Sequence, residues 1–123
     1  YSKYGCKLYN DSKGEVKISL ILKKHGINYI REYKIDHYRY RYDFFLPDFN
    51  TFIEFNGIQH YQEVKFFGGS KGFKSTKKRD KKKKELIKKQ NGILIILSYL
   101  DLESNVDFET LLLNKLKRIG INV

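Results

Sequence analysis

The chain has 123 residues, enough for one domain with a hydrophobic core and too few for two domains of ordinary size. Its 25 Lys and Arg against 14 Asp and Glu give a formal net charge of +11, and such a field attracts polyanions, with nucleic acid ahead of an acidic membrane surface. No apolar run approaches the roughly 20 residues of a membrane span, and no segment resembles a signal peptide, so we expect no membrane partner.

Residues 1–11 form an irregular N-terminal segment without a regular pattern. We interpret them as the end of a preceding region in a longer protein, since the sequence begins without Met. Cys6 is the only cysteine, which excludes an internal disulfide and favours a reducing compartment. The sequence therefore predicts a single domain over residues 1–123 with a cytoplasmic, intracellular location.

The first regular element is a helix that begins at a capping box. Ser12 and Glu15 stand three residues apart, so the hydroxyl and the carboxylate can each satisfy an amide at the helix start. Gly26 is a suitable residue for the end of this helix. Loose alternation of polar and apolar residues then predicts a first strand over residues 28–35.

A β-hairpin is the strongest structural signal in the chain. Residues 41–46 and 51–56 both alternate like strands, and residues 47–50 between them favour a turn. A loop of two or of four residues gives the same register, in which paired residue numbers sum to 97. This register places Phe44 opposite Ile53.

The same register predicts two facing carboxylates. Asp43 lies opposite Glu54, and Asn56 shares the face of Glu54 because side chains alternate along a strand. Like charges directly across a sheet repel, so the pair favours a bound cation. The hairpin is therefore predicted to carry a divalent-metal site.

The second half of the chain predicts a loop, two helices and one more strand. About fifteen residues after His60, rich in Gly, Ser and Lys, indicate a mobile loop or one ordered only by ligand. A helix over about 78–90 and an aliphatic strand over 93–97 follow, and a cap at 104–107 predicts a last helix. The order α, β, β, β, α, β, α predicts an α/β fold, a mixed β-sheet flanked by helices.

A dense basic run precedes and enters the helix over 78–90. On that helix Asp80, Lys83, Lys84 and Ile87 share one stripe, so Asp80 and at least one of the two lysines turn toward the core. The other cations of the run suit contacts with DNA phosphates. These expected DNA-binding residues are Lys71, Lys74, Lys77, Lys78, Arg79, Lys81 and Lys82.

The spacing of Asp43, Glu54 and Asn56 resembles the motif of the PD-(D/E)xK, restriction-endonuclease-like superfamily. In that motif a second acid follows the first by about ten residues, and a polar residue stands two positions further along. Asn56 stands where that family usually has Lys. The chain also resembles very-short-patch mismatch-repair endonucleases, and still more phage homing endonucleases with an EDxHD pattern. The resemblance lies in segments 41–44, 53–60, 79–80 and 91–95. That pattern falls on Glu15, Asp43, His60 and Asp80.

This resemblance implies a homing- or repair-type endonuclease, phage- or virus-encoded, that cuts duplex DNA with Mg²⁺ or Mn²⁺. The two facing acids of the hairpin, together with a main-chain carbonyl, suit such a hard cation. The metal ligands would be Asp43, Glu54 and Phe55, and the catalytic residues Glu15, Asp43, Glu54, His60 and Asp80. Gln59 would be a further site residue beside Asn56.

The chemistry also assigns roles at the site. His60 would be the general base, because the unperturbed pKa of a histidine side chain suits proton transfer at neutral pH. Lys83 or Lys84 would contact phosphate where the motif lysine is missing, and Glu15 would orient water or bind a second cation.

Simpler explanations remain open at this stage. Asp43 and Glu54 could be surface acids in salt bridges, Glu15 only a cap, and the basic run only a solvated face. Two other functions compete with the nuclease: a non-catalytic basic DNA-binding domain, and an RNA-processing nuclease that stacks bases on Tyr and Phe. A domain this small could also need an additional domain or a homodimer for specificity.

Overall fold

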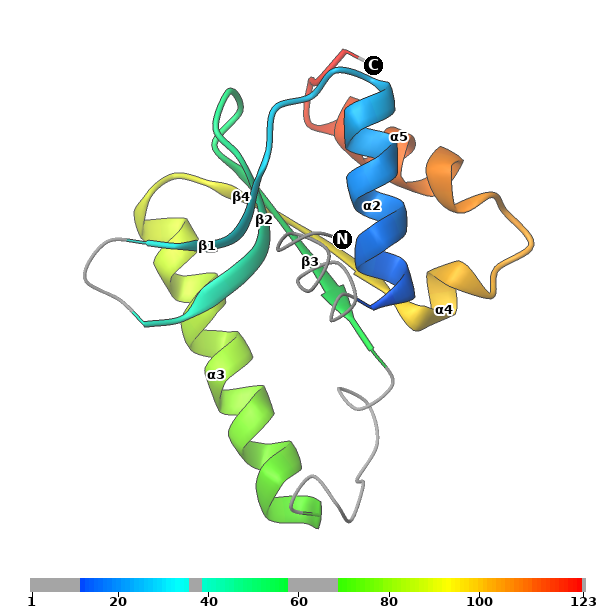
Figure 1. Ribbon diagram of the computed structural model, residues 1–123. Coiled ribbons are helices and arrows are strands. Elements are labelled where there is room, and N and C mark those ends of the chain that lie inside the picture. Colours follow the sequence, from blue (N-terminus) through cyan, green and yellow to red (C-terminus); the bar gives the residue numbers. More distant parts are fainter. Residues whose placement is uncertain (1–11, 36–38, 58–68, 123) are drawn as a thin grey trace, which may run out of the picture.

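The computed structural model describes residues 12–35, 39–57 and 69–122, and residues 69–76 for their backbone only. The chain has a mixed α/β fold with a four-stranded sheet in the order β1-β2-β3-β4 (Figure 1). Strands β1, β2 and β3 are antiparallel neighbours, and β4 runs parallel to β3. The elements are α2 (Lys13–Lys24), β1 (Ile30–Lys34), β2 (Arg41–Leu46), β3 (Thr51–Asn56), α3 (Gly69–Lys89), β4 (Ile93–Ser98), α4 (Tyr99–Leu102) and α5 (Phe108–Arg118).

Helices cover both faces of this sheet, so each face has its own hydrophobic core (Figure 1). The larger core joins α2 and α5 to the sheet and includes Phe44 and Ile53. The smaller core lies under α3 and includes Tyr42, Leu86 and Ile87. Ile95 and Leu97 of β4 are buried in the larger core and Leu94 packs partly buried against the smaller one, which explains why β4 is aliphatic on both faces. The predicted mixed sheet flanked by helices is confirmed.

The hairpin has the predicted strands and register. Phe44 pairs with Ile53, and two further pairs follow toward the turn with the same sum of residue numbers. Asp48 accepts a hydrogen bond from the Asn28 side chain at 3.0 Å, as expected of a turn residue. Asn50 has the left-handed backbone (φ 49°) that Asn tolerates better than most residues, which explains its place at the end of the turn.

Helix α2 begins with the predicted capping box, in which Ser12 and Glu15 exchange hydrogen bonds of 3.1 and 3.2 Å. Gly14 is buried next to the ring of Phe55, and a Cβ at Gly14 would lie 2.3 Å from that ring. A residue without a side chain therefore lets the start of α2 approach β3 closely. This approach brings Glu15 to the end of the hairpin that carries Asp43.

Two predictions about the second half of the chain are corrected. Helix α3 starts at Gly69, well before residue 78, so the end of the expected loop is helical. Each glycine in this stretch costs a helix only about 1 kcal/mol, and the chain's single proline is Pro47, so no residue here breaks the helix. Helix α4 was missed, although Ser98 and Asp101 form a capping box with a readable sequence pattern.

Candidate active site

Strand β2 is distorted at Asp43. Its ladder with β1 pairs Arg31 with Phe44 and Tyr33 with Tyr42, and the two opposite residues between these pairs, Glu32 and Asp43, form no ladder pair. Glu32 has a left-handed backbone (φ 49°), a conformation that costs a non-glycine residue on the order of 1 kcal/mol or more. As a result Tyr42 packs under α3 while Phe44 packs under α2, although strict alternation would place both on one face.

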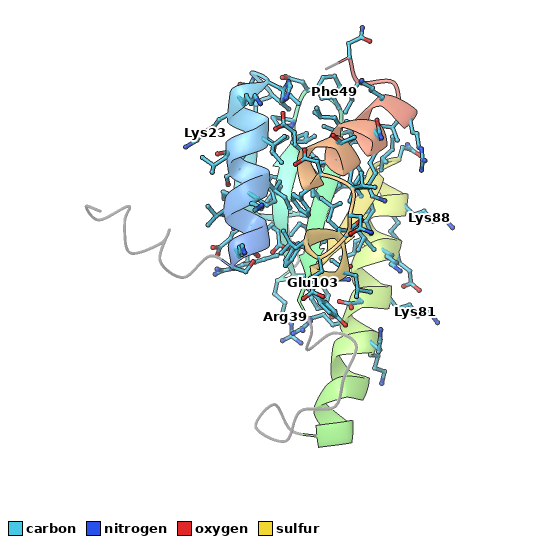
Figure 2. The ribbon with its side chains drawn as sticks, turned by 90° about the vertical axis from the view of Figure 1, so that its right-hand side faces the viewer. Lys23, Arg39, Phe49, Lys81, Lys88 and Glu103 are labelled. Carbon is cyan, nitrogen blue, oxygen red and sulfur yellow. The ribbon has the colours of Figure 1, made fainter. Side chains whose placement is uncertain are left out.

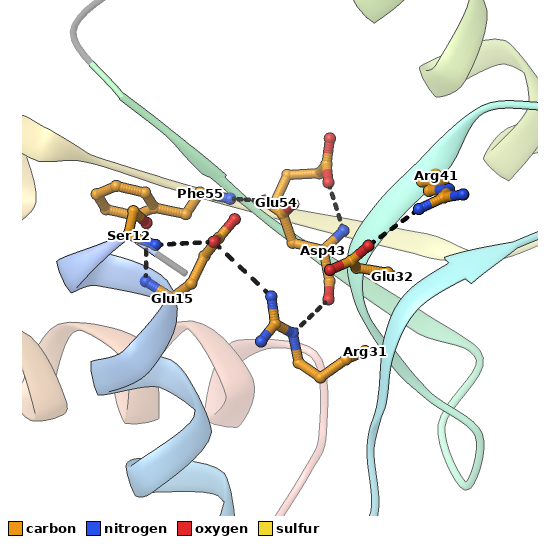
Figure 3. Close-up of polar contacts among 8 residues, drawn as sticks. All are labelled: Ser12, Glu15, Arg31, Glu32, Arg41, Asp43, Glu54 and Phe55. Carbon is orange, nitrogen blue, oxygen red and sulfur yellow. Dashed lines mark hydrogen bonds and ion pairs between the residues drawn. The ribbon is translucent and has the colours of Figure 1, made fainter. Parts of the chain in front are cut away.

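Carboxylate side chains bridge the two strands of the hairpin at this distortion. Glu54 Oε2 accepts a hydrogen bond from the backbone N–H of Asp43 at 2.7 Å, and Asp43 Oδ2 accepts one from the N–H of Phe55 at 2.8 Å (Figure 3). The predicted proximity of the two acids is confirmed. Their geometry differs from a regular cross-strand pair, because each carboxylate binds the backbone of the opposite strand.

Arg31 connects this pair to the start of α2. Its Nε donates to the carbonyl of Asp43 at 3.1 Å, and its guanidinium lies 3.7 Å from Glu15 Oε1 (Figure 3). The guanidinium also lies 4.5 Å from the centre of the Phe44 ring. Glu15 is therefore both a helix cap and a member of the acidic cluster. Arg31 is a site residue that the sequence did not reveal.

Lys83 of α3 forms an ion pair with Glu54, with Nζ 2.5 Å from Oε1 and both side chains about seven-eighths buried. Tyr42 fixes the helix at this point, because its hydroxyl donates to the carbonyl of Lys83 at 2.8 Å. Burial, reinforced by Glu54, raises the pKa of Tyr42 to about 12, so this donor keeps its proton. The inward-facing lysine of α3 is Lys83, whereas Lys84 is exposed.

These groups line one cavity of about 560 Å³, which we call the carboxylate pocket. Acids from α2, β2, β3 and α3 meet basic side chains from the β2 entry and from α3 in it. The lining residues are Glu15, Arg39, Tyr40, Arg41, Asp43, Glu54, Phe55, Asn56, Arg79, Asp80 and Lys83. The pocket brings together Glu15, Asp43, Glu54 and Asp80, the four acids that the sequence analysis selected.

The remaining predicted residues divide by position. His60 and Gln59 lie outside the described residues, and only the backbone is described at Lys71 and Lys74. Asn56 is half-buried at the end of β3. The other expected DNA contacts are exposed on α3, and Figure 2 labels Lys81 among them at the surface of the helix. These exposed residues are Lys77, Lys78, Arg79, Lys81 and Lys82.

The surroundings of Asp43 disfavour the ionised form of its carboxyl group. Burial, then the charge of Glu54 and to a smaller extent Glu15, raises the pKa of Asp43 to about 8, against the opposing hydrogen bond from the N–H of Phe55. Asp43 therefore holds a proton at neutral pH when no cation is present. A divalent ion beside it would reverse this balance and release the proton.

The pH dependence of stability should report this titration. The contribution of Asp43 to the free energy of unfolding is fully present below its unfolded pKa of about 4 and is lost as the pH rises through its folded pKa of about 8. Asp43→Asn keeps a neutral acceptor and removes the titration. In thermal melts without metal, the Tm of the variant minus the Tm of the wild type should increase by about 5 °C or more from pH 5 to pH 9. A constant difference in Tm would contradict the raised pKa.

The donor set fits Mg²⁺ as a partly hydrated ion. In the described part of the chain, no group of three or more His, Cys, Asp or Glu side chains is arranged to hold a metal. Mg²⁺ commonly uses one or two carboxylates, keeps several waters and takes its other ligands from substrate phosphate. Asp43, Glu54 and the Phe55 carbonyl suit that mode of binding.

Comparisons with known proteins add no identification. No family model matches the sequence, and no curated protein matches it. Among the helices of the described residues, none combines the length and the apolar character needed to cross a membrane. The function therefore has to be argued from the pocket and its surroundings.

Proposed function

We propose that this protein is a Mg²⁺-dependent endonuclease that hydrolyses phosphodiester bonds in duplex DNA, of the homing or repair type. The observation that carries the proposal is the acidic pair of Asp43 and Glu54 with Lys83 against it, beside an exposed basic face of α3. Hydrolysis of a phosphodiester needs stabilisation of negative charge at the scissile phosphate and a means of activating water. The pocket offers groups for both tasks.

The fold supports this proposal in its element order. The element order is α2, the antiparallel strands β1 to β3, then α3 and the parallel strand β4, all around one sheet. The acids lie at one end of the β2–β3 hairpin. This arrangement is the one expected for a restriction-endonuclease-like domain, and we propose that fold here. The acids that define its motif occupy β2 and β3, and the basic helix precedes β4.

The metal would be held by Asp43, Glu54 and the carbonyl of Phe55. When bound, Mg²⁺ supplies Lewis-acid stabilisation of the phosphate and a more acidic water. The chain's own task is to hold the two carboxylates in place. The N–H groups of Asp43 and Phe55 do so by fixing Oε2 of Glu54 and Oδ2 of Asp43. The other Glu54 oxygen, Oε1, is paired with Lys83, so a bound ion would compete with that ammonium for it.

Lys83 takes over the role of the lysine that the motif lacks at Asn56. Its ammonium lies beside Glu54, although the side chain comes from α3 instead of β3. A cation at this position would stabilise negative charge that develops on the phosphate. The structure therefore offers a physical reason why a neutral Asn56 is compatible with hydrolysis.

Proton transfer is assigned to His60 and Glu15. His60 is proposed as the general base on the ground of its residue type and its place directly after the hairpin in the sequence. Glu15 is held in the pocket by Ser12 and Arg31, where a carboxylate can orient the attacking water. Asp80 lines the same pocket and is proposed to assist there.

Cleavage of end-labelled duplex fragments in Mg²⁺ or in EDTA tests the proposal, with single-stranded RNA as a second substrate. We expect new DNA ends in Mg²⁺ alone, and binding that weakens steeply with added salt because α3 contacts phosphates. Salt-sensitive binding without cleavage in Mg²⁺ or Mn²⁺ would indicate a non-catalytic DNA-binding domain. Faster cleavage of the RNA would indicate an RNA-processing enzyme.

A further inference from the structure

A second cavity, which we call the α3–β4 groove, adjoins the carboxylate pocket. It has a volume of about 320 Å³. The two cavities share a boundary of polar residues from β3 and α3. The shared residues are Glu54, Asn56, Asp80 and Lys83. A ligand in the groove would therefore lie next to the groups proposed to hydrolyse DNA.

The groove combines an apolar wall with a cationic rim. Leu94 and Ile96 of β4 line it, and both side chains are only half-buried although they lie on the face toward α3. Lys77, Lys81 and Lys84 come from α3 at i, i+4 and i+7, so they form one row along the helix. The groove thus offers a surface for a flat apolar group and cations for phosphate.

The packing of α3 explains why this space is open. The helix is anchored on the sheet near its C-terminal end, where Leu86 and Ile87 are buried in the smaller core. Its N-terminal part extends beyond the sheet in both views (Figures 1 and 2). Lys77, Lys81 and Lys84 line the groove together with Leu94 and Ile96, and the space between them stays open.

We propose that the α3–β4 groove binds one unstacked nucleotide of the DNA strand, next to the phosphate in the carboxylate pocket. This inference rests on the proposed function, which supplies DNA as the ligand. The base would lie on Leu94 and Ile96, and the row of lysines would contact its phosphate. A duplex does not fit a groove of 320 Å³, whereas that volume lies at the small end of ordinary ligand pockets.

The first test uses the Asp43→Asn protein, a single-stranded DNA pentamer and no added metal, so that no cleavage occurs. Methyl NMR should show ring-current shifts at Leu94 and Ile96 when the pentamer is added, and no comparable shifts with inorganic phosphate. Saturable binding of the pentamer without any shift at these methyl groups would overturn the proposal. The readout does not depend on catalysis, so an inactive protein would not confuse the result.

The second test fills the groove. Ile96→Trp should weaken pentamer binding about tenfold, because the indole ring would occupy the space that the base takes in the groove. Ile93→Trp is the matched control, since Ile93 lies on the same strand, is 38% exposed and does not line the groove. Equal affinities for the two folded variants would overturn the proposal. Tenfold tighter binding of a ribonucleotide pentamer would overturn its assignment to DNA.

Discussion

We expect Asp43→Asn to lower the rate of DNA cleavage in Mg²⁺ by a factor of about 10³ or more and to leave DNA binding largely intact. The amide can still accept the hydrogen bond from Phe55, so the hairpin keeps its geometry. It lacks the negative charge that a divalent cation requires. Single-turnover cleavage with saturating protein separates this loss from any change in binding.

The matched control for this variant is Asp48→Asn. Asp48 also belongs to the hairpin, but it lies in the turn and binds the Asn28 side chain at 3.0 Å. We expect its cleavage rate to remain within about twofold of the wild type, because surface substitutions away from a site have small effects. Full activity of Asp43→Asn, or an equal loss in both variants, would remove Asp43 as a metal ligand.

Lys83→Met should lower the single-turnover rate about a hundredfold while reducing the Mg²⁺ concentration needed for half-maximal activity. The rate falls because a charged donor no longer stabilises the phosphate. The metal requirement falls because Lys83 no longer competes for Glu54, which its ammonium contacts at 2.5 Å. A Mg²⁺ titration of the cleavage rate measures both quantities in one experiment.

Lys84→Met serves as the control for that experiment, since Lys84 is the next residue on α3 and is exposed. Loss of this lysine should weaken DNA binding slightly and make it less dependent on salt, with the single-turnover rate unchanged. If Lys83→Met and Lys84→Met behave alike, Lys83 is one more phosphate contact and the replacement for the motif lysine lies elsewhere.

Most of the sheet was predictable because its signals are local. Alternation over residues 41–46 and 51–56, with one turn between them, leaves a single register, and that register brings Asp43 to Glu54. The capping box at Ser12 likewise placed the start of α2 correctly. These patterns involve residues close together in sequence, so the sequence alone specifies them.

The parts that were missed depend on tertiary packing. Nothing in the sequence marks Glu32 as left-handed, and nothing in it shows that Tyr42 and Phe44, two residues apart on β2, pack on opposite faces of the sheet. Arg31 contacts the carbonyl of Asp43 because β1 pairs with β2 on either side of that residue, a contact that depends on the folded sheet. The helical spacing on α3 allowed either Lys83 or Lys84 to face the core. The hydrogen bond from the Tyr42 hydroxyl to the carbonyl of Lys83 fixes α3 against the sheet at this residue, and Lys83 is the one that faces inward.

Nicking of supercoiled plasmid by wild-type protein and Asp43→Asn, purified in the same way, tests the central claim most directly. We expect the wild type to convert supercoiled plasmid to nicked or linear forms in Mg²⁺, and neither protein to do so in EDTA. Asp43→Asn in Mg²⁺ should leave the plasmid supercoiled. Equal conversion by the two proteins, or none by the wild type in Mg²⁺ or Mn²⁺, would contradict a metal-dependent nuclease centred on Asp43 and Glu54.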